Sequence, residues 1–201
     1  QRFSGWQTTP VPVVFVNALS QKDTIGSVCV DYEDCSYTIT KEMINCGNKK
    51  IVFVGTEHKY ALNEMKERGY KRAMIEAGYE PELIYSSGNI DKNEVFFSNY
   101  LDNHKPEVAL VVRDSMAISF MNVASKRGIK VPDEFQVIGF QNTRYAHLSN
   151  PKLTCAEIPI YEMGNKAMSY LTELMKDENK NHHKANKILL AYDICWREST
   201  K

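Results

Sequence analysis

Near its middle the chain reads Val108-Ala109-Leu110-Val111-Val112-Arg113-Asp114-Ser115-Met116-Ala117, an uninterrupted apolar run joined directly to a helix-forming segment. The valine-rich run predicts a strand that is buried on both faces. Asp114 stands where an acid caps a helix, and Gly128 stands where a helix ends, so a helix is expected over 114–127. A buried strand followed at once by a helix is the building unit of a parallel sheet covered by helices.

The same alternation extends over most of the chain. Further strands are expected at Val13–Val16, Ser27–Val30, Lys50–Val54, Leu83–Tyr85, Phe135–Phe140, Leu153–Glu157 and Ile188–Cys195. Further helices are expected near 32–46, 61–77, 91–103 and 161–176, with capping acids at Asp31 and at Asp91 with Glu94, and with stops at Gly47 and Gly78. This order predicts an α/β fold with doubly wound parallel sheets.

Composition excludes several classes of protein. The chain has 201 residues, of which 43% are hydrophobic and 25% charged, as in an ordinary globular protein. Its 25 basic and 25 acidic residues cancel, whereas a free-standing nucleic-acid binder usually carries a basic excess. No apolar run reaches 18 residues, so no membrane span is expected.

Cysteine and histidine usage argues against a metal site and against disulfides. The five cysteines form no C-x-x-C pair, and the helical spacing of Cys35 and Cys46 with Ile39 and Met43 predicts buried thiols. Such usage suits a reducing cytosol. His182 and His183 lie in a polar stretch that predicts a solvated loop. No metal and no cofactor is therefore expected.

Four segments, taken in order, carry a family resemblance: Val11–Asn17 with Val28–Glu33; Gly47–Gly55 with Gly69–Ala73; Asp114–Ala117 with Arg127–Glu134 and Val137–Phe140; and Pro151–Thr154 with Gly164 and Arg197–Lys201. Together they resemble the effector-binding domain of the lactose-repressor (LacI/GalR) family of transcription regulators. Single motifs are weak, but the ordered set spans essentially the whole chain. Asp31–Glu33, Gly69–Ala73 and Asn142–Arg144 are most similar to one branch of the family.

The resemblance implies a periplasmic-binding-protein type I fold of two lobes, with crossovers near Asp31, Glu157 and Ala191. The near lobe would comprise 1–31 and 157–191, and the far lobe 32–156 and 192–201. Family members begin with a DNA-binding helix-turn-helix and the first strands of the near lobe. Because neither is found here, the near lobe is expected to be incomplete and the DNA-binding part to be missing.

The resemblance also implies a small-molecule effector site at Asn17, Lys66, Ile90, Arg113 and Gln141. Many sugar-sensing members have Arg, Asn and Asp at the positions of Lys66, Arg113 and Gln141. The side-chain charges of Arg, Asn and Asp sum to zero, whereas those of Lys66, Arg113 and Gln141 sum to plus two. An ionised carboxylate accepts hydrogen bonds from vicinal sugar hydroxyls, so its loss at Gln141 disfavours a neutral sugar. A sugar phosphate is therefore the expected ligand, although a plain sugar remains open.

Structural alternatives exist for these residues. Arg113 could pair with Asp114, Glu134 or a main-chain carbonyl, and Lys66 could point to solvent. The resemblance further implies a homodimer, with Arg144, Tyr145 and Tyr161 as candidate partner or dimer contacts. It also permits a serine-phosphorylated phosphocarrier protein as a partner, with no contact set that can be matched to this sequence.

Two other functions, a transporter receptor and an enzyme, are alternatives to a cytoplasmic regulator. An extracytoplasmic sugar-binding receptor of a transporter shares the fold, but the unpaired cysteines and the Arg197–Thr200 segment favour the regulator. An enzyme is not expected, because no G-x-G-x-x-G, P-loop or G-x-S-x-G motif is found. His58, His104 and His147 have no nucleophile at motif spacing.

Overall fold

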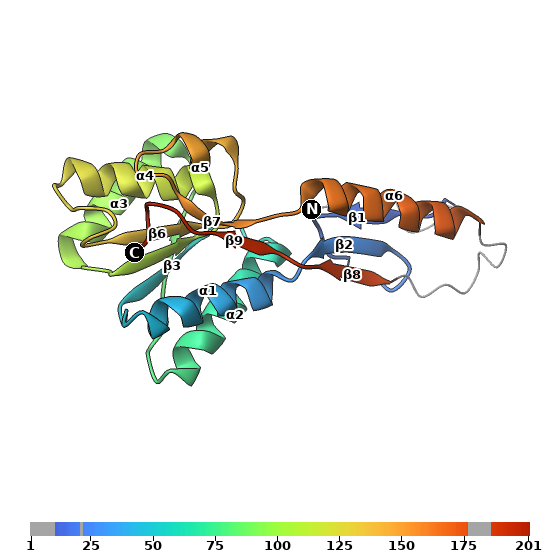
Figure 1. Ribbon diagram of the computed structural model, residues 1–201, viewed down its shortest axis with the longest axis horizontal. Helices are drawn as coiled ribbons and strands as arrows, with labels where there is room; N and C mark the ends of the chain where they lie inside the picture. The colour runs from blue at the N-terminus through green and yellow to red at the C-terminus, as the bar shows by residue number, and fades with distance from the viewer. Residues whose placement is uncertain (1–10, 21, 177–185) are drawn as a thin grey trace. The chain divides into compact units, whose positions relative to one another are not determined.

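A computed structural model describes residues 11–20, 22–176 and 186–201, and the chain divides into two compact units (Figure 1). Unit 1 lies within residues 1–30 and 159–191, and unit 2 comprises residues 31–158 and 192–201. The three changes of unit fall within two residues of Asp31, Glu157 and Ala191. Each unit has a sheet of its own.

Unit 2 is built on a six-stranded sheet in the order β4-β3-β5-β6-β7-β9. The strands are β3 (Ile51–Thr56), β4 (Glu82–Ser86), β5 (Val108–Val111), β6 (Gln136–Gly139), β7 (Thr154–Glu157) and β9 (Asp193–Cys195). Every residue of β3, β5 and β6 is buried, as the apolar runs predict. Neighbouring strands from β4 to β7 are parallel, and only β9 deviates by pairing antiparallel with β7. The α/β fold class is confirmed.

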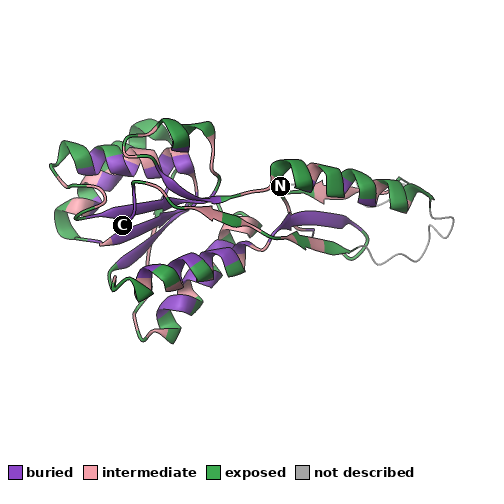
Figure 2. Cartoon of the chain, viewed as in Figure 1, coloured by how far each residue is buried: buried purple, intermediate pink, exposed green. Residues whose placement is uncertain are grey.

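Helices cover both faces of this sheet (Figure 1). One face carries α1 (Tyr32–Asn45) and α2 (Ala61–Glu76); the other carries α3 (Ile90–Asn103), α4 (Asp114–Lys126) and the short α5 (Arg144–Leu148). A Cβ at Gly69 would lie 2.0 Å from the carbonyl oxygen of Glu33, so glycine permits the close approach of α1 and α2. Stacked rings of Phe97 and Phe120, 4.3 Å apart, join α3 to α4. Figure 2 shows burial concentrated in the strands and the inner helix faces.

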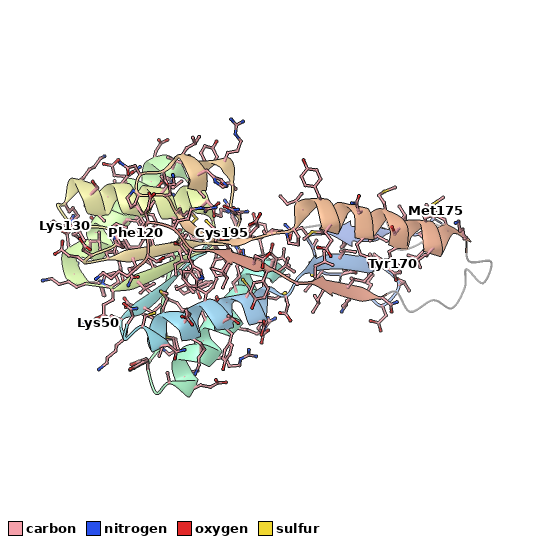
Figure 3. The ribbon with its side chains drawn as sticks, in the orientation of Figure 1. Lys50, Phe120, Lys130, Tyr170, Met175 and Cys195 are labelled. Atoms are coloured by element: carbon pink, nitrogen blue, oxygen red, sulfur yellow. The ribbon has the colours of Figure 1, made fainter. Side chains whose placement is uncertain are left out.

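Unit 1 contains a three-stranded parallel sheet in the order β1-β2-β8. Its strands are β1 (Val14–Val16), β2 (Gly26–Val30) and β8 (Lys187–Leu190), and α6 (Ile160–Lys176) packs on them. Met163, Ala167 and Tyr170 form the buried stripe of α6. The Tyr170 ring occupies the space above Gly26, where a Cβ would lie 2.5 Å from the ring (Figure 3).

Two predictions about secondary structure are wrong. The single strand predicted at Ile188–Cys195 is two strands, because β8 ends at Leu190 and β9 begins at Asp193 in the other unit. Helix α3 is capped by Asn89, whose side chain accepts hydrogen bonds from Asp91 N and Lys92 N, rather than by Asp91 with Glu94. The capping prediction for Asp31 is confirmed, since its side chain accepts from Asp34 N at 3.0 Å.

The predicted burial of Cys46 is also wrong. Cys35, Ile39 and Met43 are buried along α1, but the helix ends at Asn45 and Cys46 lies exposed at its C-cap. Gly47, Gly78 and Gly128 end their helices with positive φ angles of 93°, 79° and 75°, as predicted.

No helix within the described residues has both the length and the apolar character that a bilayer crossing requires. In the same part of the chain, no group of three or more His, Cys, Asp or Glu side chains is arranged to hold a metal ion. His182 and His183 lie outside the described residues.

Candidate functional site

The carboxyl ends of the parallel strands in unit 2 meet along one edge of the sheet. Ligands of open α/β sheets bind beyond this edge. Four polar residues lie here and are called the carboxyl-edge cluster: Lys66, Arg113, Asp114 and Gln141. Lys66 approaches the carbonyl oxygen of Val112 directly after β5, and Asp114 accepts a hydrogen bond from Gln141 N shortly after β6.

Lys66 is the buried cation of the cluster. Only 4% of the residue is exposed, so the alternative in which it points to solvent is wrong. Its Nζ lies 3.5 Å from both Asn63 Oδ1 and Val112 O, which is long for hydrogen bonds. Rings of Tyr32 and Phe140 flank it at 4.6 and 5.1 Å. No carboxylate of the described residues lies within ion-pair distance of this ammonium group.

Burial lowers the pKa of Lys66 from 10.5 to about 8. The electrostatic interactions of Lys66 with Cys35 and Asp114 oppose this shift, and the positive charge of Arg113 adds to it. A protonated amine in this position is costly because water is excluded and the nearby acceptors are weak. An additional anionic acceptor at the cluster would reduce that cost.

Arg113 contributes the second positive charge, at the N-cap of α4. Its guanidinium lies 5.9 Å from the Tyr60 ring, and a Cβ at Gly88 would lie 3.1 Å from its Nη1. No hydrogen bond or ion pair within the described residues engages this guanidinium, so the proposed pairing with Asp114 or Glu134 is wrong. The first main-chain N–H groups of α4 follow immediately, and such groups favour anions.

Asp114 holds the loop that follows β6. It is fully buried and does not cap α4, contrary to the sequence-based prediction. Its Oδ1 accepts from Gln141 N at 3.2 Å, and its Oδ2 accepts from Thr143 N at 2.7 Å and Thr143 Oγ1 at 2.8 Å. Asn142 between them has a φ of 50°. Residues 141–143 are therefore fixed beside Arg113 by one carboxylate.

Comparisons with known proteins show the family of this chain. Residues 40–200 match the family described as periplasmic binding protein-like domain. The chain belongs to this family. It is 34% identical to catabolite control protein A of Priestia megaterium over 202 residues, covering 96% of this chain and 59% of that relative. The chain thus spans less than two thirds of that relative's length.

Solved structures of family members are similar as well. The transcription regulator CcpA of Lactococcus lactis has a TM-score of 0.80 and 31% identity, covering 94% of this chain and 70% of that chain. A LacI-type transcription regulator from Bifidobacterium animalis subsp. lactis has a TM-score of 0.85 at 21% identity, covering all of this chain and 76% of that one, and supports the fold alone. The predicted resemblance to the LacI/GalR effector-binding domain, and to catabolite control protein A in particular, is confirmed.

Three of the five effector residues implied by the family resemblance are brought together in unit 2, namely Lys66, Arg113 and Gln141. Gln141 is exposed at the start of its loop. Ile90, 67% exposed, begins α3 two residues after Gly88, which contacts Arg113. Asn17 follows β1 in unit 1, where its φ is 50° and its N–H donates to Val28 O. The effector role of all five stays a prediction.

The candidate partner contacts lie on exposed helices. Arg144 begins α5 and is exposed, Tyr145 beside it is 64% exposed, and Tyr161 at the start of α6 is 91% exposed. Nothing in the chain alone identifies what these side chains contact, so their role stays a prediction.

Several residues that shape the cluster were not predicted from the sequence. Gly88 leaves room for the Arg113 guanidinium, and Tyr32 and Phe140 flank Lys66. A signal for the burial of Lys66 was available, since Gly69, Tyr70 and Ala73 at helical spacing from it are all buried. A separate surface depression of about 460 Å³, bordered by Met121 and Gly128 among others, lies at the other end of α4. It takes no part in the cluster.

Proposed function

We propose that this chain is the ligand-sensing domain of a DNA-binding transcription regulator of carbohydrate metabolism, and that the carboxyl-edge cluster binds a sugar phosphate. The similarity to catabolite control protein A at 34% identity, and to the transcription regulator CcpA at 31% identity, supports the regulatory role. The observation that carries the ligand class is the buried ammonium of Lys66 next to the guanidinium of Arg113, neither of which forms an ion pair among the described residues.

The chemistry of the cluster favours an anion. Arg113 offers planar donors that suit phosphate oxygens, and the first turn of α4 adds main-chain N–H groups. The ammonium group of Lys66 is buried, so solvent screens its positive charge little. Gln141 can donate to and accept from sugar hydroxyls through its amide. With Asp114 as its one carboxylate, the cluster keeps an excess of one positive charge beside a neutral sugar, whereas a phosphate would supply an anion to offset it.

Regulation would follow from a difference in ligand affinity between two states of the protein. A ligand shifts such an equilibrium only by that difference, and couplings of about 1–3 kcal/mol are typical. The proposal includes a cytoplasmic homodimer whose DNA-binding helix-turn-helix lies outside the 201 residues. A phosphocarrier protein is retained as a possible second regulator, with no residue assigned to it.

Isothermal titration calorimetry on the full-length regulator tests the ligand class. Glucose 6-phosphate and fructose 1,6-bisphosphate are expected to bind at least about tenfold more tightly than trehalose, which corresponds to about 1.4 kcal/mol. Replacing Arg113 with Asn and Gln141 with Asp should reverse the preference toward the neutral sugar. Arg127→Asn, at the other end of α4, is the matched control and should leave it unchanged. Tightest binding by trehalose would reject a phosphate ligand.

DNA binding separates the regulator from a transporter receptor of the same fold. The full-length protein is expected to retard operator fragments from its own promoter in a gel-shift assay, with a shift that responds to the ligand found by calorimetry. Ligand binding without any DNA retardation would instead favour the receptor.

A further inference from the structure

Cys155 and Cys195 lie directly opposite each other in unit 2. Strands β7 and β9 are antiparallel, and their register pairs Cys155 with Cys195. Directly opposite residues of an antiparallel pair point to the same face of the sheet, with Cα atoms about 4.5–5.5 Å apart. A disulfide requires Cα atoms about 4.4–6.8 Å apart. The backbone therefore already has the spacing that a bridge between these two thiols needs.

The two sulfur atoms contact the residues that hold the loop formed by residues 141–143. Cys155 is fully buried, and its Sγ lies 3.7 Å from Asp114 Oδ1. Cys195, labelled in Figure 3, is partly exposed; its Sγ donates to Glu157 Oε2 at 2.9 Å and accepts from Asn142 Nδ2 at 3.8 Å. The Asn142 main chain also forms a hydrogen bond to Cys155. Asn142 thus contacts both thiols through different groups.

We propose that Cys155 and Cys195 form a reversible disulfide that couples thiol oxidation to the 141–143 loop. The oxidant is a low-molecular-weight disulfide. The Cys195 sulfur attacks it, releasing one small thiolate and giving a mixed disulfide. The Cys155 sulfur then displaces the second small thiolate. In total, two protein thiols lose two electrons and two protons, and one small disulfide is reduced to two thiols.

The surroundings determine the order and the rate of these steps. Cys195 reacts first because it is partly exposed, and Glu157 can accept its proton. Burial raises the pKa of Cys155 to about 12, and burial together with Glu157 raises the pKa of Cys195. Because the thiolate is the nucleophile, exchange is slow. The pair therefore responds to sustained oxidation and not to a brief pulse.

Formation of the disulfide would alter the loop formed by residues 141–143. An S–S bond removes the thiol proton that Cys195 donates to Glu157, and it redirects the sulfur atoms that Asn142 and Asp114 now contact. Asp114 also fixes Gln141 and Thr143, so the change reaches the carboxyl-edge cluster. This coupling rests on the proposed function, whereas formation of the bridge does not.

Mass spectrometry of the native full-length protein tests the bridge without any ligand. After prolonged incubation with oxidised glutathione, a digest should contain a peptide pair linking Cys155 to Cys195, with a mass two hydrogen atoms below the sum of the two reduced peptides. Dithiothreitol should remove this link. A Cys195→Ser variant should lose the link, and a Cys155→Ser variant should stop at a glutathione adduct on Cys195. Cys46→Ser removes an exposed thiol and should change nothing at this pair.

Two outcomes would overturn the inference. One is an absence of the Cys155–Cys195 peptide pair under native conditions at equilibrium with the oxidant. The other is a link that appears only after unfolding in urea, since the folded register would then play no part. For the coupling, the oxidised protein should bind the ligand found by calorimetry about fivefold or more weakly, and the Cys195→Ser variant should show no such change. An unchanged affinity in the bridged protein would reject the coupling alone.

Discussion

The charged side chains at the two ends of helix α4 differ in whether they form ion pairs. At its carboxyl end, Lys126 pairs with Glu94, and Arg127 pairs with Asp102 and donates to Ser98 Oγ. Most of these side chains are exposed. At its amino end, Arg113 has no ion pair among the described residues, and Lys66 beside it is buried without a carboxylate partner.

This difference between the two ends separates charged side chains that stabilise the fold through ion pairs from charged side chains that do not. Exposed pairs contribute about 0–1 kcal/mol each and cost little when they are lost. A buried, unpaired cation destabilises the folded state, so its presence calls for another explanation. Local features that weaken a fold are expected at functional sites. The contrast within one helix therefore supports the amino end as the ligand site.

The largest effect is expected from Asp114→Ala. This change removes the acceptor for Gln141 N, Thr143 N and Thr143 Oγ1, and it leaves these partly buried donors unpaired around a fully buried position. The free energy of unfolding should fall by about 3–5 kcal/mol, measured by urea denaturation. Asp102→Ala, at the other end of α4, is the matched control and should cost less than about 1 kcal/mol. Equal losses in the two variants would contradict the comparison.

A smaller effect of opposite sign is expected from Lys66→Met. Methionine fills a similar volume without a charge, so the free energy of unfolding at pH 7 should rise by about 1–3 kcal/mol. The same variant should bind the sugar phosphate less tightly. A loss of stability at pH 7 would show that Lys66 has a better counter-charge than its surroundings indicate.

The gain from Lys66→Met should also depend on pH. The folded-state pKa of Lys66 is about 8 and the unfolded value is 10.5, so between these pH values the unfolded chain binds the proton that the folded chain has lost. Wild-type stability therefore rises relative to the variant as pH increases from about 8 to 10.5. Below pH 8 the difference should be constant. Denaturation curves of both proteins across this range measure it.

The smallest effect is expected from Lys126→Ala. Its ammonium pairs with Glu94 in an exposed position. The free energy of unfolding should change by less than about 0.5 kcal/mol, and the change should vanish in 1 M salt, where the screening length is about 3 Å. A salt-independent loss above 1 kcal/mol would mean that the carboxyl end of α4 is not simply a set of surface pairs.

Most of the fold could be predicted because its elements follow local rules. The five long helices begin and end within one residue of the expected positions, since apolar periodicity marks all five and stop glycines mark the ends of α1, α2 and α4. The break between β8 and β9 was missed because the apolar run continues through Tyr192 and Ile194. Helix α5 was missed because five residues are too few for a periodic pattern.

The candidate site was harder to predict, because the role of each of its residues depends on contacts with parts of the chain that are distant in sequence. An acid at the start of a helix indicates a cap, and only the folded chain shows that Asp114 instead binds a loop 27 residues later. Likewise, Arg113 could have been paired, and only its surroundings reveal that it is not. The positions of Lys66, Arg113 and Gln141 came from the family resemblance, whereas their charge environment came from the structure.

The order of segments in the chain also has a consequence for protein synthesis. Unit 2 needs residues 192–201, which the ribosome makes only after residues 159–191 of unit 1. Until β9 has been made, β7 presents an open edge, and the Ser199 hydroxyl has not yet engaged Thr154 N and Val137 O. Unit 2 can therefore be completed only after unit 1 has been translated in full. A nascent chain that stalls before residue 192 would therefore leave a strand edge available for aggregation.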